Sequence, residues 1–234
     1  MANLIKVSSP YVYQKMERVD TSAGRVYKSD KNGQMPSVTT ILSATKDKAS
    51  LEAWAARIGA EEAERIKRDA AHVGTAMHQV MESFIAGEPL PVAEDWLQMR
   101  GYEMGHRLIN KFFPNIDEIW GSEVPLYYPE KYAGTTDLVA VYRGKEAIVD
   151  FKQSIKPKRH EWIGDYFHQL AAYAMAHNIV HGTNINYGVV LVSVQDGTTQ
   201  EFTTAGHEFE RYKKEWMERV EMYQRKVASN GNSF

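Results

Sequence analysis

Two aspartates and a lysine stand close together between Gly134 and Lys152, in the stretch GTTDLVAVYRGKEAIVDFK. They are Asp137, Asp150 and Lys152. Carboxylates are preferred ligands of Mg²⁺ and Mn²⁺. A lysine beside such an ion can position an attacking water or offset charge on a phosphate. The alternative is a structural cluster of ion pairs at a strand end, and the residue types alone do not separate the two.

This stretch has the pattern of a β-hairpin. Its two arms, 135–142 and 147–152, are rich in β-branched and aromatic residues, as strands are. Between them, Gly144-Lys145 predicts a two-residue type II′ turn. A loop one residue longer would turn one arm over and scatter the three charged groups.

The predicted turn sets the register of the hairpin. It pairs Arg143 with Glu146, and it therefore places Asp137 opposite Lys152. Opposed residues share a face, and so do residues two apart on one strand, so Asp137, Asp150 and Lys152 should project together. The other face should be buried core; it contains Leu138, Ala140, Tyr142, Ala147, Val149 and Phe151.

Several short motifs surround this hairpin and carry a family resemblance. They are P-S-V-T at 36–39, G-T-x-x-H at 74–78, G-T-T-D at 134–137, D-F-K-x-S-x-K-P-K at 150–158 and Q-x-x-x-Y at 169–173. In this order and spacing they resemble the PD-(D/E)XK nuclease superfamily in its RecB-like branch. Within that branch the sequence looks closest to the mitochondrial genome maintenance exonucleases and their phage relatives. The resemblance covers roughly 36–223.

The resemblance implies an α/β fold with a restriction-endonuclease-like core, in which helices flank a central mixed β-sheet on both sides. We expect one domain over 1–234, with a lead-in at 1–35, a core at 36–228 and a frayed tail at 229–234. The implied activity is metal-dependent exonucleolytic hydrolysis of DNA, dependent on a free end and favouring single strands. Two alternatives are a structure-specific endonuclease on the same core and a non-catalytic DNA-binding subunit with a decayed site. The intact Asp137, Asp150 and Lys152 argue against the second.

The same resemblance assigns a metal site for one or two Mg²⁺ or Mn²⁺ ions. It implies Asp137, Asp150 and the Phe151 carbonyl as ligands, together with His78. Without the family context, a lone histidine in an apolar helix is usually a core residue. Glu123 is a further acid that this branch often carries, and Glu118 is its competitor.

Other residues receive roles in binding and orienting DNA. In the family Lys152 orients the nucleophile or offsets phosphate charge, and Gln169 and Tyr173 orient the attacked phosphate or its water. The remaining candidates for contact with the DNA strand are Ser154, Lys156 and Lys158 in the basic loop, and Ser37 and Thr39, of which Ser37 is also a plausible helix N-cap. Tyr132, Trp162 and Tyr166 are candidates for base stacking.

Composition limits the remaining possibilities. The chain has 234 residues and a net charge of 28 − 30 = −2, so a phosphate-binding surface must be a local patch. The absence of cysteine excludes disulfides, thiolate zinc sites and a cysteine-ligated iron–sulfur cluster. No signal peptide or long apolar run stands out, which predicts a cytoplasmic protein of a bacterial or phage-infected cell with no membrane partner. Expected partners are DNA with a free single-stranded end and replication or recombination proteins of the host or phage.

Periodicity predicts the elements that must hold these residues. A polar helix over 49–70 should bury a stripe containing Leu51, Trp54, Ala55 and Ile58, and a second helix over 72–86 carries His78. Further helices are expected at 92–113, 161–180 and 207–228, strands at 117–128, 184–194 and 200–204, and small strands at 12–13 and 25–27.

Overall fold

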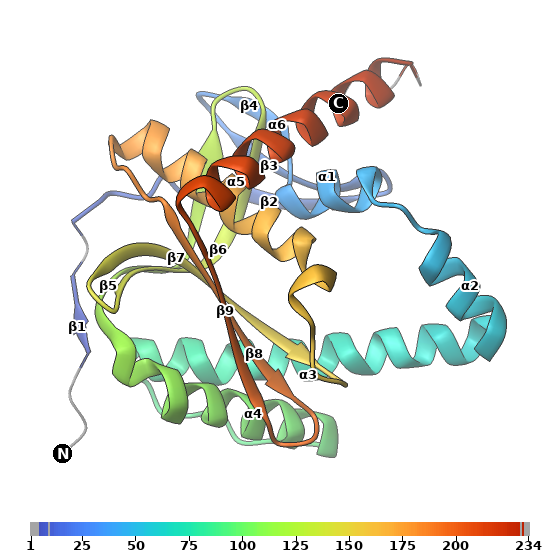
Figure 1. Cartoon of the computed structure of the whole chain (residues 1–234), viewed down its shortest axis with the longest axis vertical. Coiled ribbons are helices and arrows are strands. Elements are labelled where there is room, and N and C mark those ends of the chain that lie inside the picture. Colours follow the sequence, from blue (N-terminus) through green and yellow to red (C-terminus); the bar gives the residue numbers. More distant parts are fainter. Residues whose placement is uncertain (1–4, 9, 230, 232–234) are drawn as a thin grey trace.

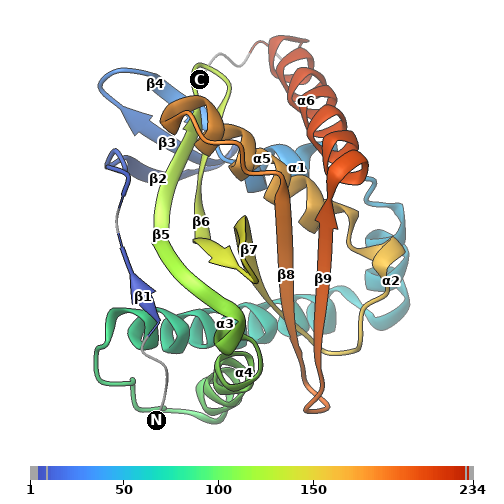
Figure 2. The same ribbon diagram turned by 60° about the vertical axis from the view of Figure 1, so that its left-hand side comes forward.

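A mixed six-stranded sheet lies at the centre of the computed structural model, which describes residues 5–8, 10–229 and 231 (Figures 1 and 2). The strand order is β1-β5-β6-β7-β8-β9; β1 with β5 and β7 with β8 run parallel, and the other neighbours are antiparallel. The strands are β1 (Lys6–Val7), β5 (Ile116–Tyr128), β6 (Tyr132–Tyr142), β7 (Lys145–Ser154), β8 (Tyr187–Val194) and β9 (Thr199–Ala205).

Helices cover both faces of this sheet, which confirms the predicted fold class. On one face α3 (Ala60–Ala86) and α4 (Trp96–Phe112) form one hydrophobic core; on the other, α1 (Val38–Thr45), α5 (Gly164–His181) and α6 (Gly206–Ser229) form a second (Figure 1). Short 3₁₀ turns span Phe113–Asn115 and His160–Trp162. The expected frayed tail at 229–234 lies almost entirely outside the described residues.

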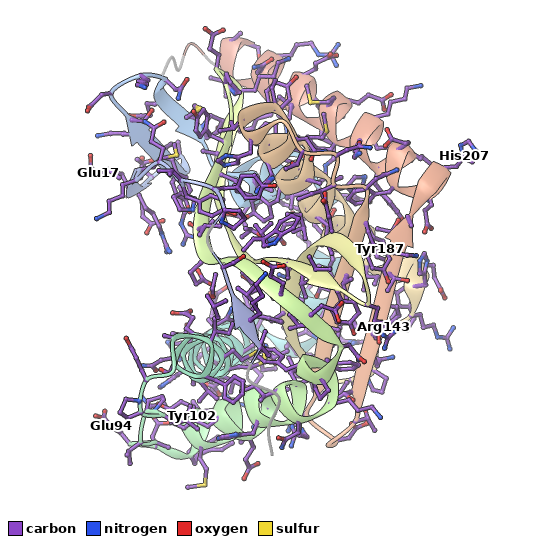
Figure 3. All side chains as sticks on the ribbon, turned by 90° about the vertical axis from the view of Figure 1, so that its left-hand side faces the viewer. Glu17, Glu94, Tyr102, Arg143, Tyr187 and His207 are labelled. Carbon is purple, nitrogen blue, oxygen red and sulfur yellow. The ribbon has the colours of Figure 1, made fainter. Side chains whose placement is uncertain are left out.

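The lead-in forms a small antiparallel sheet of its own. Its strands are β2 (Glu17–Thr21), β3 (Gly24–Ser29) and β4 (Gly33–Pro36). The expected small strand at 25–27 lies within β3, whereas 12–13 is not a strand. Glu17 on this small sheet and Arg143 at the hairpin turn lie on opposite sides of the molecule in Figure 3.

The helix preceding the sheet differs from the prediction. A short α2 (Ala49–Ile58) ends at Gly59, whose φ of 92° breaks the helix, and α3 then runs unbroken through the predicted boundary near 71. The predicted buried stripe is confirmed only in part: Trp54, Ala55 and Ile58 are half-buried, but Leu51 is 45% exposed, and α2 stands away from the sheet (Figure 1). A glycine with positive φ stopped the helix, whereas Gly74 is accommodated inside α3.

Two glycines let α4 pack closely against α3. A Cβ at Gly101 would lie 2.5 Å from the Val73 carbonyl oxygen, and one at Gly105 would lie 3.0 Å from the Met77 carbonyl oxygen. The α4 backbone therefore approaches α3 at the turns that precede His78. This packing fixes the part of α3 that faces the sheet.

The hairpin turn is displaced by one residue from the prediction. Arg143 and Gly144 form the loop, with φ of 48° and 74°, as in a type I′ turn. Arg143 tolerates this conformation because its guanidinium makes two 2.9 Å hydrogen bonds to Glu201 and its N–H donates to Asn115. The loop still has two residues, so the faces are as predicted. The six expected core residues all lie in the α3–α4 core.

Buried His177 on α5 predicts a loss of stability in acid. Its side chain contacts the Tyr13 hydroxyl at 3.3 Å, Thr183 Oγ1 at 2.8 Å and the His181 ring, whose centroid is 4.6 Å away. Burial lowers the pKa of His177 to about 4, below its unfolded value of 6.5. The stability it contributes is therefore present above pH 6.5 and lost as the pH falls towards 4, by about 2–3 kcal/mol.

His177→Gln should accordingly reduce the difference in urea midpoint between pH 7.5 and pH 4.5. The exposed His207, which points into solvent in Figure 3, provides the matched control as His207→Gln. An unchanged pH dependence in His177→Gln would contradict the assignment.

Candidate metal centre

Strands β6 and β7 separate at the predicted aspartates. The ladder between them ends at the pair Leu138 and Val149, while β6 continues beside β5 and β7 beside β8. Asp137 and Asp150 are the first residues beyond the ladder. There the Phe151 N–H donates to Asp137 Oδ2 at 2.7 Å, so a side chain takes the place of a strand partner. The divergence opens the sheet and leaves the Asp137 carboxylate at its mouth.

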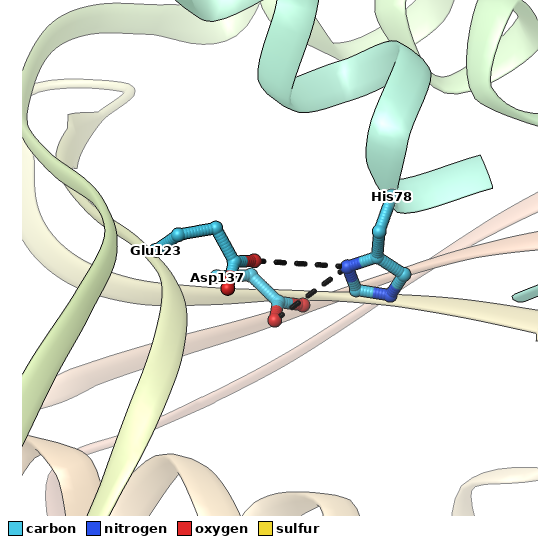
Figure 4. A group of neighbouring side chains, drawn as sticks. All are labelled: His78, Glu123 and Asp137. Carbon is cyan, nitrogen blue, oxygen red and sulfur yellow. Dashed lines mark ion pairs between the residues drawn. The ribbon is translucent and has the colours of Figure 1, made fainter. Parts of the chain in front are cut away.

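Three side chains from three elements meet at this point (Figure 4). His78 Nδ1 on α3 lies 3.7 Å from Asp137 Oδ1 on β6 and 3.9 Å from Glu123 Oε1 on β5. One ligand atom of each lies within 4.8 Å of the others. His78 Nε2 is 3.1 Å from the Phe151 carbonyl oxygen. One imidazole and two carboxylates at this separation are a donor set for Mn²⁺ or Mg²⁺.

The charge of His78 depends on its two acidic neighbours. Burial disfavours the imidazolium, but Asp137 and Glu123 outweigh burial and raise the pKa of His78 to about 9. At neutral pH the ring therefore carries a proton that offsets part of the acidic charge. A ligand imidazole must be neutral, so binding a divalent ion through His78 would release this proton.

Glu123 is held in a strained conformation. Its φ is 50°, in the left-handed region that disfavours a residue with a side chain. It lies between the pairs Ser122–Leu138 and Val124–Thr136, and so faces Asp137 across the β5–β6 ladder. The sheet therefore holds two like charges opposite each other, at a cost in backbone strain. Such an arrangement favours a cation between them.

Glu123→Asn should weaken the response of the protein to metal. In the metal-free protein, asparagine relieves the left-handed φ and the repulsion from Asp137, but it also removes the attraction to the protonated His78, so the melting temperature at neutral pH should change little. The rise in melting temperature on adding Mn²⁺ should shrink. Glu130→Asn is the control, because exposed Glu130 also has a positive φ, of 62°. An Mn²⁺ response equal to that of the unaltered protein would exclude Glu123 as a ligand.

Behind this group lies a buried ion pair. Asp150 is 1% exposed, and its Oδ2 lies 2.5 Å from Lys152 Nζ. Apart from that ion pair, neither Asp150 oxygen has a hydrogen-bond partner in the described residues. Burial raises the pKa of Asp150 to about 6. Burial opposes the charge of Lys152, but Asp150 and Asp137 together outweigh it and raise the pKa of Lys152. Lys152 Nζ also lies 5.4 Å from the centre of the Tyr166 ring on α5.

A cleft of about 500 Å³ opens over the His78, Glu123 and Asp137 group. Gly134 shapes its wall, since a Cβ there would lie 2.8 Å from the Tyr173 ring. Gln169 Nε2 is 3.5 Å from the Tyr173 hydroxyl. Of the residues predicted to act on DNA or metal, those lining the cleft are Ser37, Thr39, His78, Glu123, Asp137, Gln169 and Tyr173.

The basic loop after β7 is not part of this cleft. Ser154 Oγ is buried and donates to the Lys156 carbonyl at 2.6 Å. Both the N–H and the carbonyl of Lys158 are bonded to the Gln200 side chain. The described contacts of Ser154 and of the Lys158 backbone therefore stabilise the loop, and the predicted contacts of Ser154, Lys156 and Lys158 with DNA stay predictions.

Three other expectations are resolved by packing. Ser37 caps α1 by accepting from the Thr40 N–H at 2.9 Å, as predicted. Glu118 pairs with Lys6 at the β1 edge, so Glu123 is the acid that reaches the cleft. Tyr132 is fully buried and donates to the Ala172 carbonyl, so its predicted base stacking is wrong.

Several residues of the cleft were not predicted from the sequence. Thr75, Gln79 and Glu82 lie on α3 at helical spacing around His78, a signal that was present in the sequence. Burial, with a contribution from Glu123, raises the pKa of Glu82. Thr135 was also within reach of the sequence, because it lies two residues from Asp137 on the same face of β6. Arg18, Arg25 and Tyr27 come from the lead-in, whose approach only the folded chain reveals.

Comparisons with known proteins identify the relatives of this chain. It is 29% identical to the human mitochondrial genome maintenance exonuclease 1 over 207 residues, covering 82% of this chain and 59% of that protein. It is 30% identical to the Xenopus tropicalis protein of the same name over 180 residues, covering 71% of this chain and 50% of that protein. The mouse protein is 28% identical, with 82% and 60% covered. No protein-family model matches the chain.

These matches confirm the predicted resemblance: the chain is a homologue of the mitochondrial genome maintenance exonucleases, and their names support its assignment to a nuclease family. It spans about half to three-fifths of the length of these relatives. A solved structure of a protein assigned as an exonuclease in Eubacterium rectale has a TM-score of 0.47 and 14% identity, and covers 71% of this chain and 69% of its own. Among the helices of the described residues, none has both the length and the apolar character that crossing a bilayer requires.

Proposed function

We propose that this protein is a divalent-metal-dependent deoxyribonuclease. The observation that carries the proposal is the convergence of His78, Glu123 and Asp137 within 4.8 Å at the mouth of the diverging strands. The buried pair of Asp150 and Lys152 lies directly behind them. The names of the related exonucleases support the same chemistry.

The donor set fits Mg²⁺ or Mn²⁺ better than softer metals. Carboxylate and carbonyl oxygens dominate, and the chain has no cysteine. The ion would be held by Asp137, Glu123 and His78, and the Phe151 carbonyl lies adjacent to them. Behind them lie the Asp150 oxygens, which have no hydrogen-bond partner in the described residues apart from the ion pair with Lys152. A bound ion would supply an activated water and offset charge on the phosphate.

The remaining side chains orient the phosphodiester. Tyr173 remains a hydrogen-bond donor because burial raises its pKa well above the usual value, and Gln169 beside it adds an amide donor. Lys152 stays protonated beside Asp150 and provides a fixed cation behind the reacting group. The Phe151 N–H fixes the Asp137 carboxylate in place. Each group is positioned before substrate arrives, which is what electrostatic catalysis requires.

Action from a free end and preference for single strands form the finer part of the proposal. Their support is the resemblance to exonucleases. The test compares 5′- and 3′-labelled linear single strands, linear duplexes and circular single strands, each with Mg²⁺, Mn²⁺ or EDTA. Degradation of linear single strands alone, abolished by EDTA, is expected. Cleavage of the circle would indicate an endonuclease, and activity in excess EDTA would reject the metal.

A further inference from the structure

The cleft is charged unevenly, and its permanent cations come from the lead-in sheet. Among the described residues that line it, the acids Glu82, Glu123 and Asp137 come from α3, β5 and β6. The arginine or lysine side chains among these described lining residues are Arg18 on β2 and Arg25 on β3. We propose that Arg18 and Arg25 form a clamp that binds the phosphodiester backbone of DNA opposite the acidic group. This inference rests on the proposed function for its substrate.

The register of the small sheet places these side chains together. Arg18 pairs with Tyr27, and Asp20 pairs with Arg25, across the β2–β3 ladder. Opposed residues and residues two apart share a face, so Arg18, Asp20, Arg25 and Tyr27 all project towards the cleft. The intervening Val26 lies on the other face and is fully buried. The hairpin thus presents these charged groups on one face, and it is anchored by Val26 on the other face and by Tyr27, which is 3% exposed.

The clamp is attached rigidly to the strand that carries Asp137. The Tyr27 hydroxyl lies 3.0 Å from Thr135 Oγ1, and Thr135 is two residues from Asp137 on the same face of β6. The Arg25 carbonyl accepts from the Ser37 N–H and from Thr40 Oγ1, both at 2.9 Å. A phosphate chain lying along the cleft would therefore meet fixed cations on one side and the acidic group on the other.

Asp20 limits the strength of the clamp. Its carboxylate lies 2.9 Å from Arg25 Nε and 3.8 Å from Arg18 Nη2. The hydrogen bond from Arg25 lowers the pKa of Asp20, so this acid is charged wherever DNA is bound. It orients the guanidinium and at the same time competes with phosphate for it. Asp20→Asn would keep an acceptor for Arg25 Nε while removing the competing charge.

The test measures binding of a fluorescein-labelled oligothymidylate in EDTA, as a function of salt. Arg18→Gln and Arg25→Gln should each weaken binding and reduce the slope of log K against log salt by about 0.7. Asp20→Asn should strengthen binding. Lys28→Gln is the matched control, because Lys28 neighbours Tyr27 on β3 but faces away from the cleft. A thermal melt of each variant checks the fold.

Two outcomes would overturn the clamp: slopes unchanged in both arginine variants, or weaker binding in Asp20→Asn. Hydrolysis separates this inference from the proposed function. Turnover of thymidine 5′-(p-nitrophenyl phosphate), which is too short to lie along the whole cleft, reports on the metal site and should be equal in the Lys28→Gln control and in the unaltered protein. Salt-dependent binding without any DNA hydrolysis would reject the nuclease and retain the clamp. DNA hydrolysis by the unaltered protein, together with unchanged salt slopes in both arginine variants, would support the nuclease and reject the clamp.

Discussion

Asp137→Asn is expected to lower the rate of DNA hydrolysis by a factor of about 10²–10³, while the protein stays folded. Asparagine retains an oxygen that can accept the Phe151 N–H, now made by Asp137 Oδ2 at 2.7 Å. The substitution therefore removes a charge without removing the local hydrogen bond. It removes the repulsion between Asp137 and Glu123 but also the attraction between Asp137 and the protonated His78, so the metal-free protein should melt at an equal or lower temperature at neutral pH.

The measurement is a titration of exonuclease activity against Mn²⁺, run beside thermal melts with and without the ion. Asp137→Asn should need more Mn²⁺ and gain less stability from it. Asp30→Asn changes an exposed aspartate elsewhere and should alter neither quantity. Full activity in Asp137→Asn at the Mn²⁺ concentration that half-saturates the unaltered protein would reject Asp137 as a ligand.

The faces of the hairpin could be predicted because they depend only on parity. The turn lies one residue earlier than predicted, but its loop still has two residues, and therefore Asp137, Asp150 and Lys152 share a face as predicted. Their exact pairing could not be predicted. Contacts of Arg143 with Glu201 and Asn115, far away in sequence, fix the turn.

The approach of His78 to Asp137 could not be predicted from the sequence alone. His78 lies 59 residues before Asp137 (137 − 78), and the two meet because α3 packs on the sheet beside α4, which Gly101 and Gly105 allow to approach α3 closely. The resemblance pointed to His78, but local periodicity gives no such contact. The docking of the lead-in sheet through Tyr27 is likewise a tertiary event, which is why Arg18 and Arg25 went unrecognised.

Lys152→Ala should abolish turnover and, in addition, destabilise the protein in a manner that depends on pH. Its loss would remove the cation behind the phosphate, a reduction in rate of about 10²–10³. It would also leave Asp150, which is 1% exposed, without the ammonium 2.5 Å away. Breaking a buried ion pair on one side costs about 3–5 kcal/mol, and the partial exposure of Lys152 places this case near the lower end. Affinity for DNA should fall only slightly, because the clamp arginines remain.

The pH dependence follows from the direction of the Asp150 shift. Burial raises the pKa of Asp150 to about 6 even with Lys152 present, and removing Lys152 should raise it further. A carboxyl with a folded pKa above its unfolded value of 3.8 destabilises the fold as it ionises, from about pH 4 upward through the folded pKa. Urea unfolding should therefore show a small difference between Lys152→Ala and the unaltered protein at pH 5 and a large one at pH 8.

The double variant Asp150→Asn with Lys152→Met separates the two roles of the lysine. It removes both charges while keeping similar volumes, so much of the stability at pH 8 should return. Activity should not return, because neither the carboxylate nor the cation is restored. If stability and activity recovered together, the loss in Lys152→Ala would be a folding defect, and Lys152 would have no place in the reaction. If stability recovered without activity, the buried ion pair would serve catalysis, although uncharged side chains at these two positions would give a more stable fold.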